Sequence, residues 1–104
     1  MLFRSEAITI DTSAFSRLQP DAFKLQFTLA NAASLPVALP ALELTLTDNQ
    51  DQPVIRRALQ PADLGADTPS TLPPQGEWAA AVTLTVSPAA AGAVSGYRLL
   101  AFYP

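Results

Sequence analysis

Residues 40–64, PALELTLTDNQDQPVIRRALQPADL, decide the fold class of this chain. In residues 42–46, leucines alternate with polar side chains, which is the period of two of a β-strand with one buried face. Residues 48–52 favour a turn, because Asp and Asn tolerate left-handed backbone and bond to nearby backbone groups. Residues 53–60 are therefore expected to return as the partner strand of a β-hairpin. Residues 61–64 predict one helical turn, with proline at its first position and glycine directly after it.

The same alternation occurs on both sides of this hairpin. It predicts further strands over residues 7–11, 23–30, 78–86 and 94–103. The last of these strands is apolar on both faces, which is typical of a strand in the middle of a sheet. The side chains that we expect to be mostly buried are those at period-two positions: Phe23, Leu25, Phe27, Leu29, Leu42, Leu44, Leu46, Val82, Leu84 and Leu99.

The connections between these strands are short or rich in proline. Residues 13–20 are predicted to be a linker across an edge of the fold, 31–40 a loop, 66–76 a long surface loop, and 87–92 a capped helical turn. None of them is the amphipathic helix that a parallel crossover needs, so the pairing is expected to be antiparallel. We therefore predict an all-β fold, an antiparallel immunoglobulin-like β-sandwich of about six to seven strands, with Trp78 between the two sheets.

Length and composition limit the classes of function. The 104 residues suffice for a single domain, residues 1–104, and a composition that is 49% hydrophobic and only 14% charged argues against disorder. The net charge is −3 and the largest basic cluster is Arg56-Arg57, so neither nucleic acid nor an anionic membrane surface is an expected partner. The apolar runs are far shorter than the ~20 residues of a membrane-spanning helix.

The residue types that carry most catalysis are missing. The chain has no Cys and no His, which removes disulfides, thiol chemistry, sulfur-based zinc sites and the usual base for a Ser or Thr nucleophile. The acidic residues Asp48, Asp51, Asp63 and Asp67 lack the spacing of a calcium loop and are explained by turn chemistry. We therefore predict a protein that is not an enzyme, with no cofactor and no metal site.

Three residues are candidates for binding: Arg56, Arg57 and Tyr97. Neighbouring strand residues point to opposite faces, so one arginine is expected to lie over the core and to pair with Glu43 or Asp63, while the other faces solvent. The functional alternative is a guanidinium fork for a partner's carboxylate. Tyr97, just after a glycine at a strand start, resembles the tyrosine that pins a corner in sandwich folds; the alternative is a ligand contact.

Five blocks of sequence occur in the order known from one bacterial family. Together they resemble the C-terminal domain of unknown function in proteins that carry an N-terminal zinc ribbon and a single transmembrane helix. The similarity runs from about Ala7 to the end of the chain. The blocks are residues 28–33 (TLANAA), 40–48 (PALELTLTD), 53–57 (PVIRR), 60–64 (QPADL) and 96–104 (GYRLLAFYP).

The resemblance implies a place and a parent protein. It implies a domain on the periplasmic side of the inner membrane, excised here from a longer membrane-anchored protein, without direct membrane contact of its own. We predict a non-catalytic interaction or structural module with a protein partner, and a possible homodimer through a sheet edge. The alternative is a binder of a small apolar ligand between the two sheets, which would require a sizeable apolar pocket.

Overall fold

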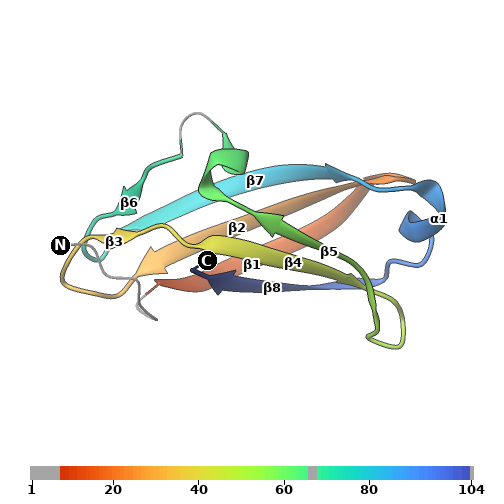
Figure 1. Cartoon of the computed structure of the whole chain (residues 1–104), viewed down its shortest axis with the longest axis horizontal. Coiled ribbons are helices and arrows are strands. Elements are labelled where there is room, and N and C mark those ends of the chain that lie inside the picture. The colour runs from red at the N-terminus through yellow and green to blue at the C-terminus, as the bar shows by residue number, and fades with distance from the viewer. Residues whose placement is uncertain (1–7, 66–67, 104) are drawn as a thin grey trace.

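The structure, a computed structural model, describes residues 8–65 and 68–103; Ala7 and Asp67, named above, lie outside the described residues. Within these ranges the chain forms eight β-strands and two short helical turns (Figure 1). In chain order they are β1 (Ile8–Gln19), β2 (Ala22–Asn31), β3 (Val37–Ala38), β4 (Ala41–Thr47), β5 (Pro53–Leu59), the 3₁₀ turn η1 (Pro61–Leu64), β6 (Thr71–Leu72), β7 (Glu77–Thr85), α1 (Pro88–Ala91) and β8 (Gly96–Phe102).

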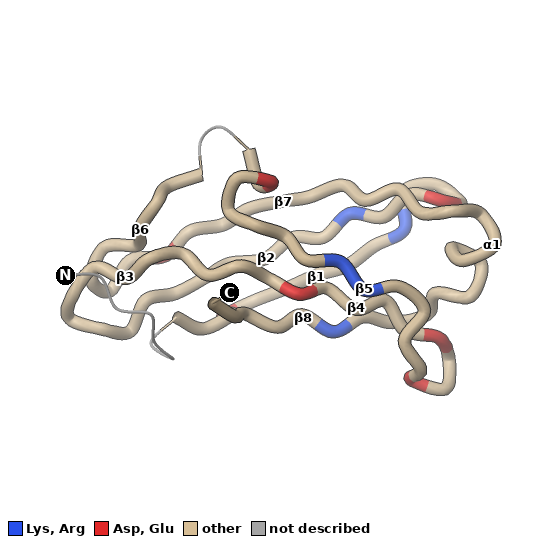
Figure 2. The backbone as a smooth tube through the Cα atoms, in the orientation of Figure 1, with Lys and Arg blue, Asp and Glu red and all other residues tan. Residues whose placement is uncertain are grey.

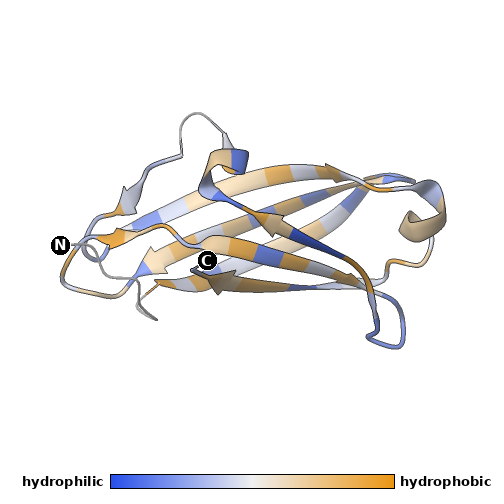
Figure 3. Cartoon of the chain, in the orientation of Figure 1, coloured by the Kyte–Doolittle hydropathy of each residue, from blue (hydrophilic) through white to orange (hydrophobic). Residues whose placement is uncertain are grey.

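The strands form small open sheets with antiparallel pairing throughout. One sheet has the order β1-β2-β7, a second has the order β5-β4-β8, and β3 pairs with β6. The two larger sheets share one hydrophobic core, in which Leu25 and Leu29 of β2 and Leu42 and Leu44 of β4 have no exposed surface. Hydrophobic and hydrophilic residues alternate along β4, as a strand with one core-facing side requires (Figure 3). The predicted all-β, antiparallel fold is therefore confirmed.

The predicted core is confirmed at eight of its ten positions, which are all buried. Val82 and Leu99 are only half-buried, although they pack against the core cluster. Both belong to edge strands, β7 and β8, where no neighbouring strand covers the outer side. The period of two thus identified the inward face correctly, but it carries no information on a strand's place in its sheet.

The prediction for the last strand is wrong in one respect. It was expected in the middle of a sheet, but β8 is an edge strand, and β4 occupies the middle. β4 is buried at every position except Glu43, which is half-buried, even though its outward residues include Thr45 and Thr47, which are 5% and 3% exposed. The two neighbouring strands therefore bury the side chains of β4. Threonine tolerates this burial because its methyl group is apolar.

The expected linker over residues 13–20 is also wrong, because β1 continues through it to Gln19. Its register with β2 shifts between Ile10 and Thr12 and again between Arg17 and Gln19. The shifts interrupt the alternation of side chains, and this is why the sequence pattern stops at residue 11. The predicted six to seven strands become eight, since β3 and β6, of two residues each, carry no detectable period.

The predicted turns are present. In the β4–β5 turn, Asp48 Oδ1 accepts from the backbone N–H groups of Gln50 at 2.8 Å and Gln52 at 2.9 Å. η1 begins at proline and ends at Gly65, whose φ of 115° lies in the region that favours glycine. α1 is capped by the side chain of Ser87, which accepts from Ala90 N–H.

Candidate functional site

Two arginines flank a buried threonine on the outer face of the β5-β4-β8 sheet. The register places Thr45 of β4 directly opposite Arg56 of β5 on one side and Arg98 of β8 on the other. Directly opposed residues of antiparallel strands share a face, so the three side chains form one row. Thr45 is only 5% exposed although it points outward, which we attribute to the aliphatic stems of the two arginines beside it.

Each guanidinium has one acidic neighbour and remains open to solvent. Arg56 Nε lies 3.6 Å from Glu43 Oε1, and Arg98 Nη2 lies 2.8 Å from Asp51 Oδ2. Arg98 Nη2 also donates to the carbonyl oxygen of Asp51 at 2.8 Å. The two arginine side chains are 59% and 53% exposed, so these ion pairs are worth little and exchange readily with another carboxylate. Basic residues on β5 and β8 with an acidic residue on β4 between them are visible in Figure 2.

In the next row of opposed residues along the same face, the two outer residues are apolar. Glu43 of β4 lies opposite Ala58 of β5 and Leu100 of β8. Leu100 is 60% exposed, the highest value among the exposed large hydrophobic residues of the described chain. We call the five residues Glu43, Thr45, Arg56, Arg98 and Leu100 the arginine face. It offers two positively charged guanidinium groups beside an exposed aliphatic side chain. This combination suits a protein surface that carries a carboxylate next to an apolar group.

Arg57, the second arginine of the predicted pair, lies on the opposite face of β5. The register places it opposite Leu44, a core residue, so the two arginines point to opposite faces of β5 as predicted. Arg57 is nevertheless exposed, as Arg56 is, so the predicted contrast between one arginine over the core and one facing solvent does not appear in their burial. The expected carboxylate partner of the inward arginine is wrong. Arg57 Nη2 instead donates to the backbone carbonyl of Thr85 in β7 at 3.4 Å, because an edge strand lets the long side chain leave the core and reach the other sheet.

Neither predicted carboxylate is near Arg57. Glu43 pairs with the outward Arg56, and Asp63 Oδ2 accepts from the backbone N–H of Gln60 at 2.8 Å in the cap of η1.

Tyr97 contacts the other sheet. Its hydroxyl is 2.8 Å from Ser13 Oγ of β1, and its ring stacks on Phe15 with centroids 5.1 Å apart. Phe15 in turn stacks on Phe23 at 5.1 Å. Tyr97 thus joins β8 to β1 instead of pinning a corner. The three predicted binding residues, Arg56, Arg57 and Tyr97, therefore do not lie together. Arg56 instead shares a row with Arg98, with Thr45 between them.

The sequence pattern did not predict that Arg98 lies in the same row as Arg56. The two residues are 42 positions apart, and only the pairing of both β5 and β8 with β4 places them in one row. It also missed Arg17, which donates to the carbonyls of Pro20, Ala91 and Val94 at 2.8–3.2 Å and lies 4.6 Å from the centre of the Phe23 ring. The only available signal was its spacing of two residues from Phe15, which places both side chains on one face of a strand. The assignment of this segment to a linker concealed that signal.

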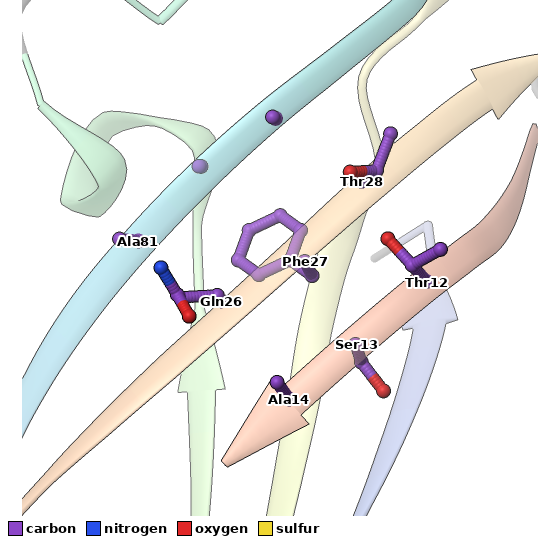
Figure 4. Close-up of a pocket in the computed structure, with 9 residues that line it drawn as sticks. Thr12, Ser13, Ala14, Gln26, Phe27, Thr28 and Ala81 are labelled. Carbon is purple, nitrogen blue, oxygen red and sulfur yellow. The ribbon is translucent and has the colours of Figure 1, made fainter. Parts of the chain in front are cut away.

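Two hollows in the described chain lie on its outer surface, and a smaller one, of about 180 Å³, opens beside the core residues Phe23 and Val94. A shallow hollow of about 520 Å³ covers the outer face of the β1-β2-β7 sheet, and Figure 4 shows its mixed lining of polar residues, such as Thr12, Gln26 and Thr28, with alanines and Phe27. A second, of about 600 Å³, lies beside the β1–β2 turn and is lined by Arg17, Leu18 and residues at both ends of α1. The ligand-binding alternative calls for a sizeable apolar pocket between the two sheets, and neither of these two larger hollows lies there.

In residues 8–65 and 68–103, no group of three or more His, Cys, Asp or Glu side chains is arranged to hold a metal ion. The same part of the chain contains no helix with the length and hydropathy needed to span a bilayer.

The fold defines the class of this protein as a mostly antiparallel β domain of small open sheets. The chain belongs to the family described as protein of unknown function (DUF3426), which it matches over residues 5–101. No curated protein matches the chain, and no solved structure matches it either. The resemblance to a domain of unknown function is thereby confirmed over nearly the whole chain.

Proposed function

We propose that this domain is a non-catalytic interaction module of a bacterial envelope protein, and that it contacts a protein partner through the arginine face. The observation that carries the proposal is the exposure of Arg56 and Arg98 beside Leu100 on one sheet face. Arginine next to an apolar anchor is typical of contact surfaces, because its planar fork binds a carboxylate in two places at once. The partner surface would carry an Asp or Glu next to an aliphatic or aromatic side chain.

The finer architecture is part of the same proposal. We infer an immunoglobulin-like arrangement of the two sheets, supported by their single shared core and by contacts at both open sides, Tyr97 to Ser13 and Arg57 to Thr85. The parent protein would carry a zinc ribbon and a transmembrane helix ahead of this domain, and the domain would lie on the periplasmic side of the inner membrane. Sequence resemblance supports both.

A binding experiment with charge reversal tests the contact. The full-length parent is tagged and recovered from its own envelope, and a co-purifying protein is then purified and titrated against the 104-residue domain. Arg56→Glu combined with Arg98→Glu should weaken that binding at least about tenfold, because two opposed charges become like charges. Lys24→Glu is the matched control, since Lys24 lies on the other sheet, opposite Ser16 and Thr83. Equal binding by both variants would contradict the arginine face.

Location and the absence of turnover are tested separately. Alkaline phosphatase fused after the last residue of the full-length parent should be active, since that enzyme folds outside the cytoplasm. An inactive phosphatase fusion, together with an active cytoplasmic reporter at the same position, would contradict the periplasmic placement. A hydrolase screen on the purified domain should give only background rates, and robust turnover that follows the protein through purification would contradict the non-catalytic role.

A further inference from the structure

β8 has the composition of a central strand at the position of an edge strand. Its residues GYRLLAF are apolar on both faces, with Arg98 as the single charge. In the part of the chain that the structure describes, only β4 pairs with it. Leu100 is consequently 60% exposed, and Leu99, which packs against the core, is only half-buried. A second strand paired with its free edge would cover more of these side chains, as the neighbours of a central strand do.

The other three edge strands of the two larger sheets are protected in the ways that natural sheets use. β5 begins with Pro53 and carries two consecutive arginines. β1 has two shifts in its register, which twist an edge away from a flat partner. β7 is flanked by η1, which lies against it (Figure 1). β8 has no proline and an unbroken register with β4 from Gly96 to Phe102; β1 of the other sheet contacts it through Tyr97 but does not pair with it. It is therefore the edge best suited to accept a further strand.

We propose that β8 pairs antiparallel with β8 of a second copy of this chain, so that Leu99 lies opposite the partner's Leu99. The β5-β4-β8 sheets of the two copies would join into one sheet of six strands. The inference rests on the proposed function as a contact module and names one partner for it. A two-fold axis through Leu99 makes the contact self-complementary and closed, which limits the assembly to a dimer.

The residues of β8 fit this register in each pair. On the outer face, Arg98 would lie opposite the partner's Leu100, where its aliphatic stem covers the most exposed leucine of the described chain. Phe102 would lie opposite the partner's Gly96, which lacks a side chain and leaves room for an aromatic ring. On the inner face, Tyr97 would lie opposite the partner's Ala101. No two like charges are opposed, whereas an axis through Arg98 would oppose the two arginines.

Sedimentation of the 104-residue chain tests for the dimer. A single strand pairing buries little surface, so we expect a weak dimer that forms over about 10 µM to 1 mM. Leu100→Lys should raise its dissociation constant at least about tenfold, because a lysine would lie opposite the partner's Arg98. Leu18→Lys is the matched control, since Leu18 is another exposed leucine, 52% exposed, beside the β1–β2 turn. Circular dichroism confirms that both variants are folded.

Cross-linking tests the register and does not depend on the Leu100→Lys variant. The chain has no cysteine, so a mixture of Arg98→Cys with Leu100→Cys should form a disulfide between copies under mild oxidation. Directly opposed positions have Cβ atoms about 5 Å apart, within reach of a disulfide. Each variant alone should cross-link several-fold more slowly. In this register a residue at position 98 or 100 lies diagonally across from the same position of the second copy, so the two cysteines are farther apart. Equal rates in all three samples would contradict this register.

The outcomes separate this inference from the proposed function. A chain that stays monomeric up to 1 mM and shows no preferential cross-link would overturn the β8 pairing, whether or not β8 binds a different strand. The titration with the envelope partner has its own readout, loss of binding by Arg56→Glu with Arg98→Glu, and it can succeed when dimerisation fails. A dimer insensitive to Leu100→Lys would place the contact on another surface and also overturn the inference.

Discussion

Asn31 shows how one side chain joins three segments of this protein. It ends β2 and is only 2% exposed. Its Nδ2 donates to the carbonyl oxygens of Leu35, Leu72 and Pro73 at 3.0–3.1 Å, and its Oδ1 accepts from the N–H of Ala33 at 2.9 Å. Only a neutral amide both donates and accepts at this place. The β2–β3 loop and the segment after β6 are therefore held to the end of β2 by one residue.

Asn31→Asp should destabilise the domain by about 2–4 kcal/mol, because a carboxylate cannot donate to the carbonyl oxygens around it and would be buried as a charge beside them. Urea unfolding followed by circular dichroism measures the loss. Asn49→Asp is the control: Asn49 lies exposed in the β4–β5 turn and should change stability by less than about 0.5 kcal/mol. Similar losses for the two variants would show that the hydrogen bonds of Asn31 contribute little.

Arg57→Ala should cost more stability than Arg56→Ala, with both losses below about 1 kcal/mol. Arg57 crosses to the other sheet through its bond to Thr85, whereas Arg56 makes a surface ion pair with Glu43 at 3.6 Å. The values are small because both residues are exposed, and exposed pairs gain little from their charge. Equilibrium unfolding of both variants in parallel gives the difference. A larger loss for Arg56→Ala would reverse the assignment of the structural arginine.

At the scale of elements, the two sheets are joined differently at their two open sides. On the β1–β8 side, three stacked rings and a hydroxyl bond connect Tyr97, Phe15, Phe23 and Ser13. On the β5–β7 side, the joining elements are η1 and the hydrogen bond from Arg57 to the Thr85 carbonyl. The stronger joint thus lies beside β8, the strand that we propose to pair with a second copy.

Tyr97→Phe should cost about 0.5–1 kcal/mol, because it removes the bond to Ser13 and keeps the ring on Phe15. Tyr97→Ala should cost about 2–4 kcal/mol, since it also removes the stacked ring. Thermal or urea unfolding measures both. The Ser13→Ala variant checks the first value, because it breaks the same bond from the other side. If Tyr97→Phe were as damaging as Tyr97→Ala, the stacking would not be the main contribution.

The whole molecule is elongated, with extents of 45 × 27 × 22 Å and a radius of gyration of 14.5 Å. This exceeds the value of about 13 Å expected for a compact chain of this length. The elongation follows from two narrow sheets whose strands run along the long axis (Figure 1). One hydrophobic cluster nevertheless contains side chains from both sheets, so neither sheet has a separate core.

The domain should therefore unfold in a single cooperative transition. Trp78 of β7 packs edge-on against Phe27 of β2, with centroids 6.2 Å apart, and its fluorescence reports on the first sheet. Circular dichroism reports on all strands. The two signals should give the same midpoint in urea, and two separated midpoints would show that the sheets unfold independently.

The sequence by itself determined the all-β class, the hairpin over residues 40–64, both helical turns and the inward faces of β2 and β4. These features depend on neighbours along the chain, since a period of two, a proline or a capping serine acts over a few residues. Only the tertiary structure decided that β4 is central and β8 an edge, and that β1 runs through a predicted linker. It also decided that Arg56 and Arg98 flank Thr45 and that Asn31 bonds to Leu72. These relations join residues that are distant in the chain, and their geometry depends on which strands pair.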